Sequence, residues 1–140
     1  MNLRQFYSVL LAMFMCTSAY PQSAYCWLWN KPSGAAGDAG GKHLVKHSNY
    51  IYNSGVFSNP SITFNDSVYA NAGGQDVFFV KRDLKGNELW AKTLGGPMNE
   101  TVVGMAVDAA GNLYLGGTFS GSLTGESAIN SNGEKDIYII

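Results

Sequence analysis

After its first twenty or so residues, the chain alternates between short apolar runs and clusters of glycine, asparagine and aspartate. Two apolar runs, residues 102–107 and 113–119, stand on either side of such a cluster, and runs of this length between turn-forming residues are typical of β-strands. A third run, residues 76–82, is apolar at nearly every position, which predicts a strand covered on both faces. Apolar residues at helical spacing do not recur after the N-terminus. The pattern therefore predicts an all-β fold.

The runs are separated by two five-residue turns of one type. Asp108-Ala109-Ala110-Gly111-Asn112 separates the first two runs, and Asp83-Leu84-Lys85-Gly86-Asn87 separates the third run from residues 88–93. An aspartate at the start of a turn can accept backbone N–H groups, and glycine or asparagine can adopt positive φ. Each sequence therefore predicts a β-hairpin.

An internal repeat organises the chain. Three blocks recur in the same order: Trp29-Asn30-Lys31 with Gly34 as Trp90-Ala91-Lys92 with Gly95; Tyr52, Gly55, Phe57 and Ser58 as Tyr114, Gly117, Phe119 and Ser120; and Asp76-Val77-Phe78-Phe79 as Asp136-Ile137-Tyr138-Ile139. The offsets between the copies are 61, 62 and 60 residues. The chain therefore contains about two copies of a repeat of roughly 60 residues, a period at the long end for propeller blades.

Two hairpins in each period predict a four-stranded antiparallel sheet. A sheet that is apolar on both faces is not stable alone in water and must stack on copies of itself. Radial stacking of four-stranded sheets is the architecture of a β-propeller, so we expect propeller blades in an incomplete propeller. A linear β-solenoid or a sandwich is the alternative, which the long period and the hairpin pairing make less favourable. Trp29 and Trp90 are expected to fill the gap between neighbouring blades.

The repeat resembles a known family, the SBBP β-propeller repeat of secreted bacterial proteins. Residues 103–119, VGMAVDAAGNLYLGGTF, carry the resemblance together with residues 76–96, which begin Asp76-Val77-Phe78-Phe79 and continue through Trp90 to Gly95-Gly96. Residues 35–50 lack the Asp-x-x-Gly-Asn turn, which puts the first hairpin of a degraded first copy in doubt. The resemblance implies a segment of a larger secreted or cell-surface protein with no catalytic residues to transfer.

The N-terminus is typical of a secretory signal peptide. Arg4 lies in a short polar start, residues 6–16 are apolar, and small residues lead to Ala19. Cleavage is expected after Ala19, with Ala24 as a second candidate. The apolar run is too short to cross a bilayer of about 30 Å as a helix, so the mature chain is expected to be exported without a membrane span.

These observations divide the chain into a signal peptide at residues 1–19, a degraded first propeller repeat at 20–84 and a second repeat at 85–140. The second repeat ends inside a strand, which indicates a truncated protein. The expected structural repeat positions are Trp29, Trp90, Asp83, Gly86, Asp108, Gly111, Asn112, Gly117, Phe119, Asp76 and Asp136.

Charge and composition exclude several classes of function. The net charge is −1, so the chain offers no electrostatic attraction to nucleic acid. Only Cys26 remains once Cys16 is removed with the signal peptide, which leaves no internal disulfide and favours a core role for Cys26. His43 and His47 have the i, i+4 spacing of a helical metal pair, yet they lie in a stretch of strand and loop without further ligands, so we interpret them as solvated.

The signals of catalysis are weak. Residues 83–90 also resemble the tryptophan-docking turn of quinoprotein dehydrogenases, which implies pyrroloquinoline quinone and a calcium ion. Lys85 stands where that motif has threonine, however, and the chain lacks the vicinal cysteine pair of many such enzymes. No Gly-x-Ser-x-Gly, phosphate-binding loop or His-Glu-x-x-His segment occurs. Asn65-Asp66-Ser67 and Asn99-Glu100-Thr101 match the glycosylation sequon.

We therefore expect a non-catalytic segment without cofactor or metal. Its repeated loops would present a binding or scaffolding surface to a protein or a glycan, and further propeller blades would adjoin it. A purely structural spacer and a fragment of a quinoprotein dehydrogenase are the alternatives.

The signal peptide gives the first testable prediction. The mature protein should begin near Tyr20, because small residues directly before a cleavage point suit signal peptidase. Amino-terminal sequencing of secreted material should find the first residue near Tyr20. Secreted protein that retains Met1 would contradict the prediction.

Overall fold

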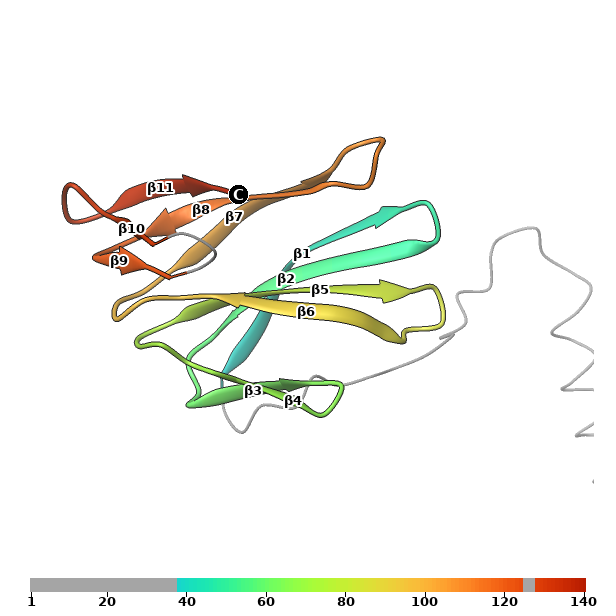
Figure 1. Cartoon of the computed structure of the whole chain (residues 1–140), viewed down its shortest axis with the longest axis horizontal. Helices are drawn as coiled ribbons and strands as arrows, with labels where there is room; N and C mark the ends of the chain where they lie inside the picture. Colours follow the sequence, from blue (N-terminus) through green and yellow to red (C-terminus); the bar gives the residue numbers. More distant parts are fainter. Residues whose placement is uncertain (1–37, 125–127) are drawn as a thin grey trace, which may run out of the picture.

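The structure, a computed structural model, describes residues 38–124 and 128–140. These residues form strands and turns without a helix (Figure 1). The strands are β1 (Ala39–His47), β2 (Tyr50–Phe57), β3 (Ser61–Phe64), β4 (Ser67–Ala70), β5 (Asp76–Asp83), β6 (Glu88–Leu94), β7 (Thr101–Val107), β8 (Leu113–Phe119), β9 (Ser122–Leu123), β10 (Ile129–Asn130) and β11 (Asp136–Ile139). The predicted all-β fold is confirmed.

Two antiparallel sheets make up most of the fold. The first has the strand order β1-β2-β5-β6, and the second has the order β11-β8-β7, which repeats β5-β2-β1 of the first. A two-stranded hairpin follows the second strand of each sheet, β3–β4 in one and β9–β10 in the other. Each sheet also has a register shift in its first strand, between Gly41 and His43 in β1 and between Val102 and Gly104 in β7. The sequence repeat is therefore a repeat of structure.

The sheets do not close into a ring within the described residues, and the second sheet has three strands. The sequence division at residue 84 differs from the division between the sheets, because β6 pairs with β5 and completes the first sheet. The passage from one sheet to the other takes place between Leu94 and Thr101.

Both predicted aspartate turns are present. In the first, Asp83 Oδ1 accepts the backbone N–H groups of Lys85 (2.8 Å) and Asn87 (2.9 Å), and Gly86 has φ 83°. In the second, Asp108 Oδ1 accepts the N–H of Asn112 (2.8 Å) and Gly111 has φ 90°. The side-chain amides of Asn87 and Asn112 also bind Oδ2 of the two aspartates, at 2.8 Å each.

These hydrogen bonds also set the charge state of the two aspartates. Those from the Asn87 and Asn112 side chains are the largest cause that lowers the pKa of Asp83 and of Asp108, so both carboxylates stay ionised well into the acidic range. The turn chemistry predicted from the sequence is thus the chemistry that forms the hairpins β5–β6 and β7–β8.

Three hairpins differ from the expectations: β1–β2 was left in doubt, and β3–β4 and β9–β10 were not predicted. The doubt about the first hairpin was wrong: β1 and β2 pair along residues 39–57 and are joined at Ser48, which has φ 52°. The β3–β4 hairpin turns at Asn65 and Asp66, whose φ values are 43° and 64°. Two consecutive residues with positive φ are typical of the tightest hairpin loops, and asparagine and aspartate tolerate this conformation best among residues with a side chain.

The apolar core is divided into two clusters, one on each face of the first sheet. The larger cluster fills the space between the two sheets, with Val56, Val77, Phe79 and Leu94 on one side and Val102, Leu115, Phe119 and Tyr138 on the other. The smaller cluster lies between the opposite face of the first sheet and the β3–β4 hairpin, and its members are Phe57, Ile62, Phe64, Phe78 and Val80. The first sheet is therefore covered on both faces, as the apolar sequence of β5 predicts.

The repeated glycine of each second strand makes room for an aromatic ring. A Cβ on Gly117 would lie 1.9 Å from the Thr101 carbonyl oxygen and 2.5 Å from the Tyr138 hydroxyl. A Cβ on Gly55 would similarly lie 2.1 Å from the Gly40 carbonyl oxygen and within 2.8 Å of the Phe78 ring. The recurrence of Gly55 and Gly117 in the sequence thus follows from steric contact across the sheet.

Adjacent glycines in β8 test this account. Gly117→Ala should destabilise the protein by about 3 kcal/mol or more, because the backbone oxygen of Thr101 cannot move away cheaply. Gly116→Ala should change the stability by less than about 0.5 kcal/mol, since a Cβ at Gly116 meets nothing within 4 Å. Urea unfolding of the two variants measures the difference, and equal effects would refute the steric explanation.

Candidate interaction surface

The contact between the two sheets shows how one copy of the repeat packs on the other. Val77 and Phe79 of β5 point from the first sheet into this contact and are 0% and 8% exposed. Tyr138, Leu115 and Val102 meet them from the second sheet. Strand β7 packs across β1 and β2 in the same contact. The face of the first sheet that carries Val77 and Phe79 is thus buried by the face of the second sheet that carries Leu115 and Tyr138.

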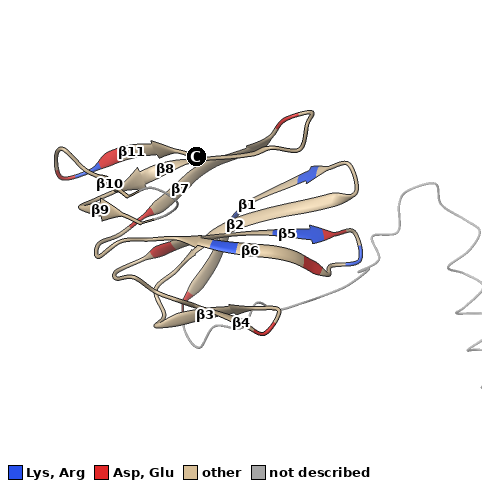
Figure 2. Cartoon of the chain, viewed as in Figure 1, with Lys and Arg blue, Asp and Glu red and all other residues tan. Residues whose placement is uncertain are grey.

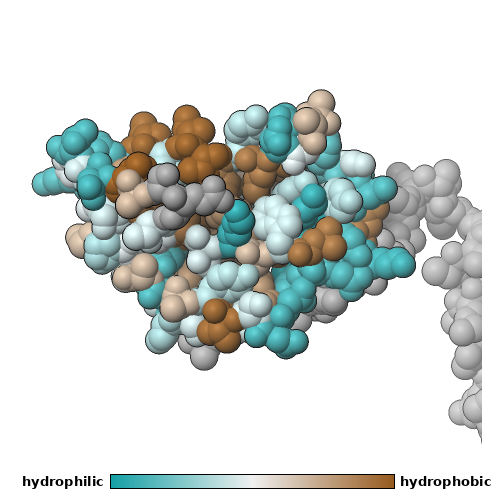
Figure 3. Space-filling model, viewed as in Figure 1, coloured by the Kyte–Doolittle hydropathy of each residue, from teal (hydrophilic) through white to brown (hydrophobic). Residues whose placement is uncertain are grey.

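Among residues 38–124 and 128–140, no element covers the outer face of the second sheet in this way. Ile137 and Ile139 occupy the repeat positions of Val77 and Phe79, yet they are 76% and 77% exposed. Val103 and Tyr114 are exposed on the neighbouring strands β7 and β8. Figure 3 shows the resulting hydrophobic surface over this part of the molecule. We refer to Ile137, Ile139, Val103 and Tyr114 together as the uncovered face.

Trp90 lies on the face of the first sheet that carries the larger apolar cluster. It is partly buried, packs against the larger apolar cluster and makes edge contacts with Tyr52 and Phe79, with ring centroids 6.3 and 6.1 Å apart. Lys81, its cross-strand partner, stacks over Tyr50 at 4.0 Å from the ring centroid. The equivalent Trp29 lies outside the described residues, as do Cys16 and Cys26.

The two repeated aspartates at the starts of β5 and β11 hold the preceding loops in the same way. Asp76 Oδ2 accepts the backbone N–H of Ala72 at 2.7 Å, and Asp136 Oδ2 accepts that of Asn132 at 2.5 Å, in each case four residues upstream. Their environments differ, because Asp76 is buried beside Glu100 at the junction of the sheets whereas Asp136 is half-buried.

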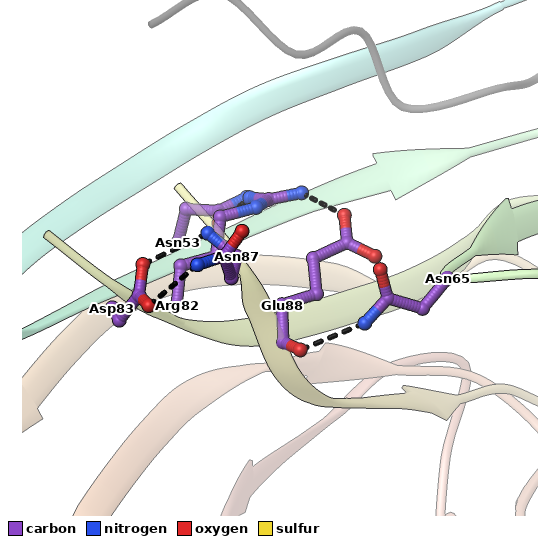
Figure 4. A network of polar contacts seen from close by, with 6 residues as sticks. All are labelled: Asn53, Asn65, Arg82, Asp83, Asn87 and Glu88. Atoms are coloured by element: carbon purple, nitrogen blue, oxygen red, sulfur yellow. Dashed lines mark hydrogen bonds and ion pairs between the residues drawn. The ribbon is translucent and has the colours of Figure 1, made fainter. Parts of the chain in front are cut away.

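A buried arginine links the Asp83 turn to the rest of the first sheet (Figure 4). The Arg82 guanidinium donates to the Asn53 side-chain oxygen and pairs with the Glu88 carboxylate at 2.5 Å. Asn65 of the β3–β4 turn donates to the Glu88 backbone carbonyl at 2.7 Å. The network therefore joins β2, β5, β6 and the hairpin, and its geometry is that of a structural ion pair.

His43 and His47 both lie on β1, where residues four apart are separated by about 13 Å, too far to bind one metal ion together. Within residues 38–124 and 128–140, no three His, Cys, Asp or Glu side chains gather at one point, and no apolar helix reaches membrane-spanning length. Charged residues occur mainly near turns and strand ends along the backbone (Figure 2).

Sequence reasoning missed Glu100, Arg82 and Glu88. In the sequence Glu100 is the middle residue of a sequon, and it also stands 62 residues after Asp38, which is one of the repeat offsets and the available signal of a repeated acidic position. Arg82 and Glu88 flank the aspartate turn, and opposite charges on either side of a hairpin are the signal that could have predicted their pairing.

No family model, curated protein or solved structure matches the chain. The resemblance to the SBBP repeat, and with it the propeller, stays a prediction from the sequence motifs. The described residues establish an all-β chain of repeated antiparallel sheets.

The position of Trp90 leads to a stability prediction. Trp90→Ala should destabilise the protein by about 3 kcal/mol, the lower end of the range for a large core aromatic, because the ring is partly exposed. Urea unfolding checks the value. A change below about 0.5 kcal/mol would mean that the ring contributes little to the contact between the sheets.

Proposed function

We propose that this chain is an exported segment of a β-propeller that provides a binding or scaffolding surface and carries out no catalysis. One observation carries the proposal: the second sheet repeats the first, and Ile137 and Ile139 of its uncovered face occupy the repeat positions of Val77 and Phe79, which the first sheet buries against the second sheet. In a propeller of such repeats, the uncovered face receives the next blade.

The exposure of the Ile137 and Ile139 side chains supports this proposal. Large aliphatic side chains more than three-quarters exposed, at adjacent positions on one strand face, are unusual for the surface of a monomer and are common at interfaces. Burying each isoleucine fully would stabilise a complex by about 1.5–3 kcal/mol. β11 is also an edge strand of its sheet. Exposed edges and apolar faces promote pairing with another sheet.

The surface for an external partner would lie at the ends of the sheets, where the turns gather. The two aspartate turns are rigid because each aspartate accepts several hydrogen bonds from its own loop. Leu84 is exposed at the tip of the first of these turns. Rigid loops on a repeated scaffold are a common way to present a binding surface to a protein or a glycan.

Association of the purified chain tests the proposal. The chain should form oligomers rather than a discrete monomer, because its uncovered face remains exposed in isolation. Ile139→Lys should raise the concentration needed for association by roughly tenfold or more, since a charge on the edge strand opposes burial. Size-exclusion chromatography with light scattering measures both effects.

Met98→Lys is the matched control, because Met98 is an exposed apolar residue in the loop before β7 and lies outside the uncovered face. It should leave association unchanged. A sharp monomer peak for the unmodified chain, with cooperative unfolding, would refute the open propeller and favour a closed two-sheet sandwich.

A further inference from the structure

Two acidic side chains from different copies of the repeat meet where the sheets join. Asp76 opens β5 of the first sheet, and Glu100 directly precedes β7 of the second. The backbone N–H of Glu100 donates to the Gln75 carbonyl at 2.7 Å, and the same segment continues as a parallel bridge between Gln75 and Asn99. The carboxyl groups are therefore part of the backbone junction between the sheets.

Both carboxyl groups are buried, and each has one oxygen without a donor. Asp76 is 1% exposed and Glu100 is 0% exposed. Asp76 Oδ2 accepts the N–H of Ala72, and Glu100 Oε2 accepts the N–H of Gly96 at 2.9 Å. Asp76 Oδ1 and Glu100 Oε1 find no hydrogen-bond donor among the residues that the structure describes. Two ionised acids in this position would leave two buried acceptors unsatisfied and two like charges close together.

Burial is the largest influence on the pKa of both acids. Burial is the largest cause that raises the pKa of Glu100, to about 7, and the charge of Asp76 adds to it, while the hydrogen bond from Gly96 opposes it. Burial also raises the pKa of Asp76. From β11, the Tyr138 hydroxyl donates to the Thr101 carbonyl at 2.8 Å, and burial followed by the charge of Glu100 raises its pKa to about 12.

We propose that Asp76 and Glu100 share one proton and act as an acid clasp, which holds the two sheets together at acidic pH and loosens above neutrality. The shared proton turns the two unpaired oxygens into one O–H···O hydrogen bond between the sheets. When it leaves, the junction contains two buried carboxylates in place of that hydrogen bond. This inference does not depend on the proposed function, because it concerns a contact inside one chain.

The direction of the pH effect follows from the raised pKa. The folded protein holds the proton on Glu100 until about pH 7, whereas the unfolded chain releases it near the ordinary value of 4.5. The stabilisation is therefore complete below the ordinary pKa and is lost as the pH rises through about 7. The protein should be less stable in mildly basic than in mildly acidic solution.

The repeat supplies a matched control for this pair. Asp136 takes the place of Asp76 in the second copy and binds its own loop in the same way, through Oδ2. Asp38 stands 62 residues before Glu100 and is exposed. Asp136 is half-buried, and Asp38 is exposed, so neither equivalent is as buried as the clasp residues. Asp136→Asn therefore removes an equivalent carboxylate without touching the junction.

Urea unfolding of the full chain, at one protein concentration, tests the clasp. The unfolding equilibrium constant of the unmodified chain should rise on the order of 50-fold between about pH 5 and pH 8. Glu100→Gln should abolish most of this rise, because the amide offers Asp76 a permanent N–H donor, and Asp76→Asn should do so as well. Asp136→Asn should leave the rise unchanged, as should Ile139→Lys, which tests the uncovered face separately.

Infrared spectroscopy detects the shared proton directly as a protonated carboxylic acid. Because the measurement uses the unmodified chain, it tests the proposal even if a variant does not fold. The unmodified chain at about pH 6 should have the C=O stretch of a protonated carboxylic acid, which is absent at about pH 9. An unchanged pH profile in Glu100→Gln, or the absence of that band, would overturn the proposal. So would restoration of stability at pH 8 by calcium in the unmodified chain alone, because the pair would then bind a cation instead of a proton.

Discussion

The fold depends on one constraint: the central strands of the sheet are apolar on both faces and must be covered on both. β5 begins with five buried residues in succession, so alternation between a core face and a solvent face is impossible there. The β3–β4 hairpin covers one face of the first sheet and the second sheet covers the other. The second copy repeats the sheet and has the same requirement, and the part of the chain that the structure describes leaves one side of β11 uncovered.

The elements that the sequence predicts correctly are those determined by local chemistry. Asp83 and Asp108 form their turns with hydrogen bonds inside five residues. The sequence of those five residues is therefore sufficient to predict the hairpin. The repeat also predicts correctly that β11 resembles β5, because Asp76 and Asp136 make the same contact with their loops. Such interactions depend on neighbours in the chain and are visible without a structure.

The features that the sequence did not predict depend on distant residues or on weak turn signals. The turn at Ser48 lacks aspartate and glycine, and the pairing of two long strands holds it in place together with a hydrogen bond from Lys46 to the Ser48 carbonyl. The Asn65-Asp66 turn is a recognisable hairpin signal, but the flanking strands are short. Glu100 acquires its environment from Asp76 and from the stacking of the sheets, so its burial could not be deduced from the residues beside it.

The strand order also has a consequence for how the chain folds. The first sheet pairs β1 with β2, β2 with β5, and β5 with β6. These strands follow one another in the sequence, except that the β3–β4 hairpin lies between β2 and β5, and all the pairings fall within residues 39–94. Contacts of this kind close short loops, which favours fast formation and lets the first sheet form before residues 101–140 are in place. The completed sheet would then offer its apolar face as a template on which β7, β8 and β11 assemble. Folding that proceeds sheet by sheet in this manner is characteristic of repeat proteins, in which each unit contacts only its neighbours.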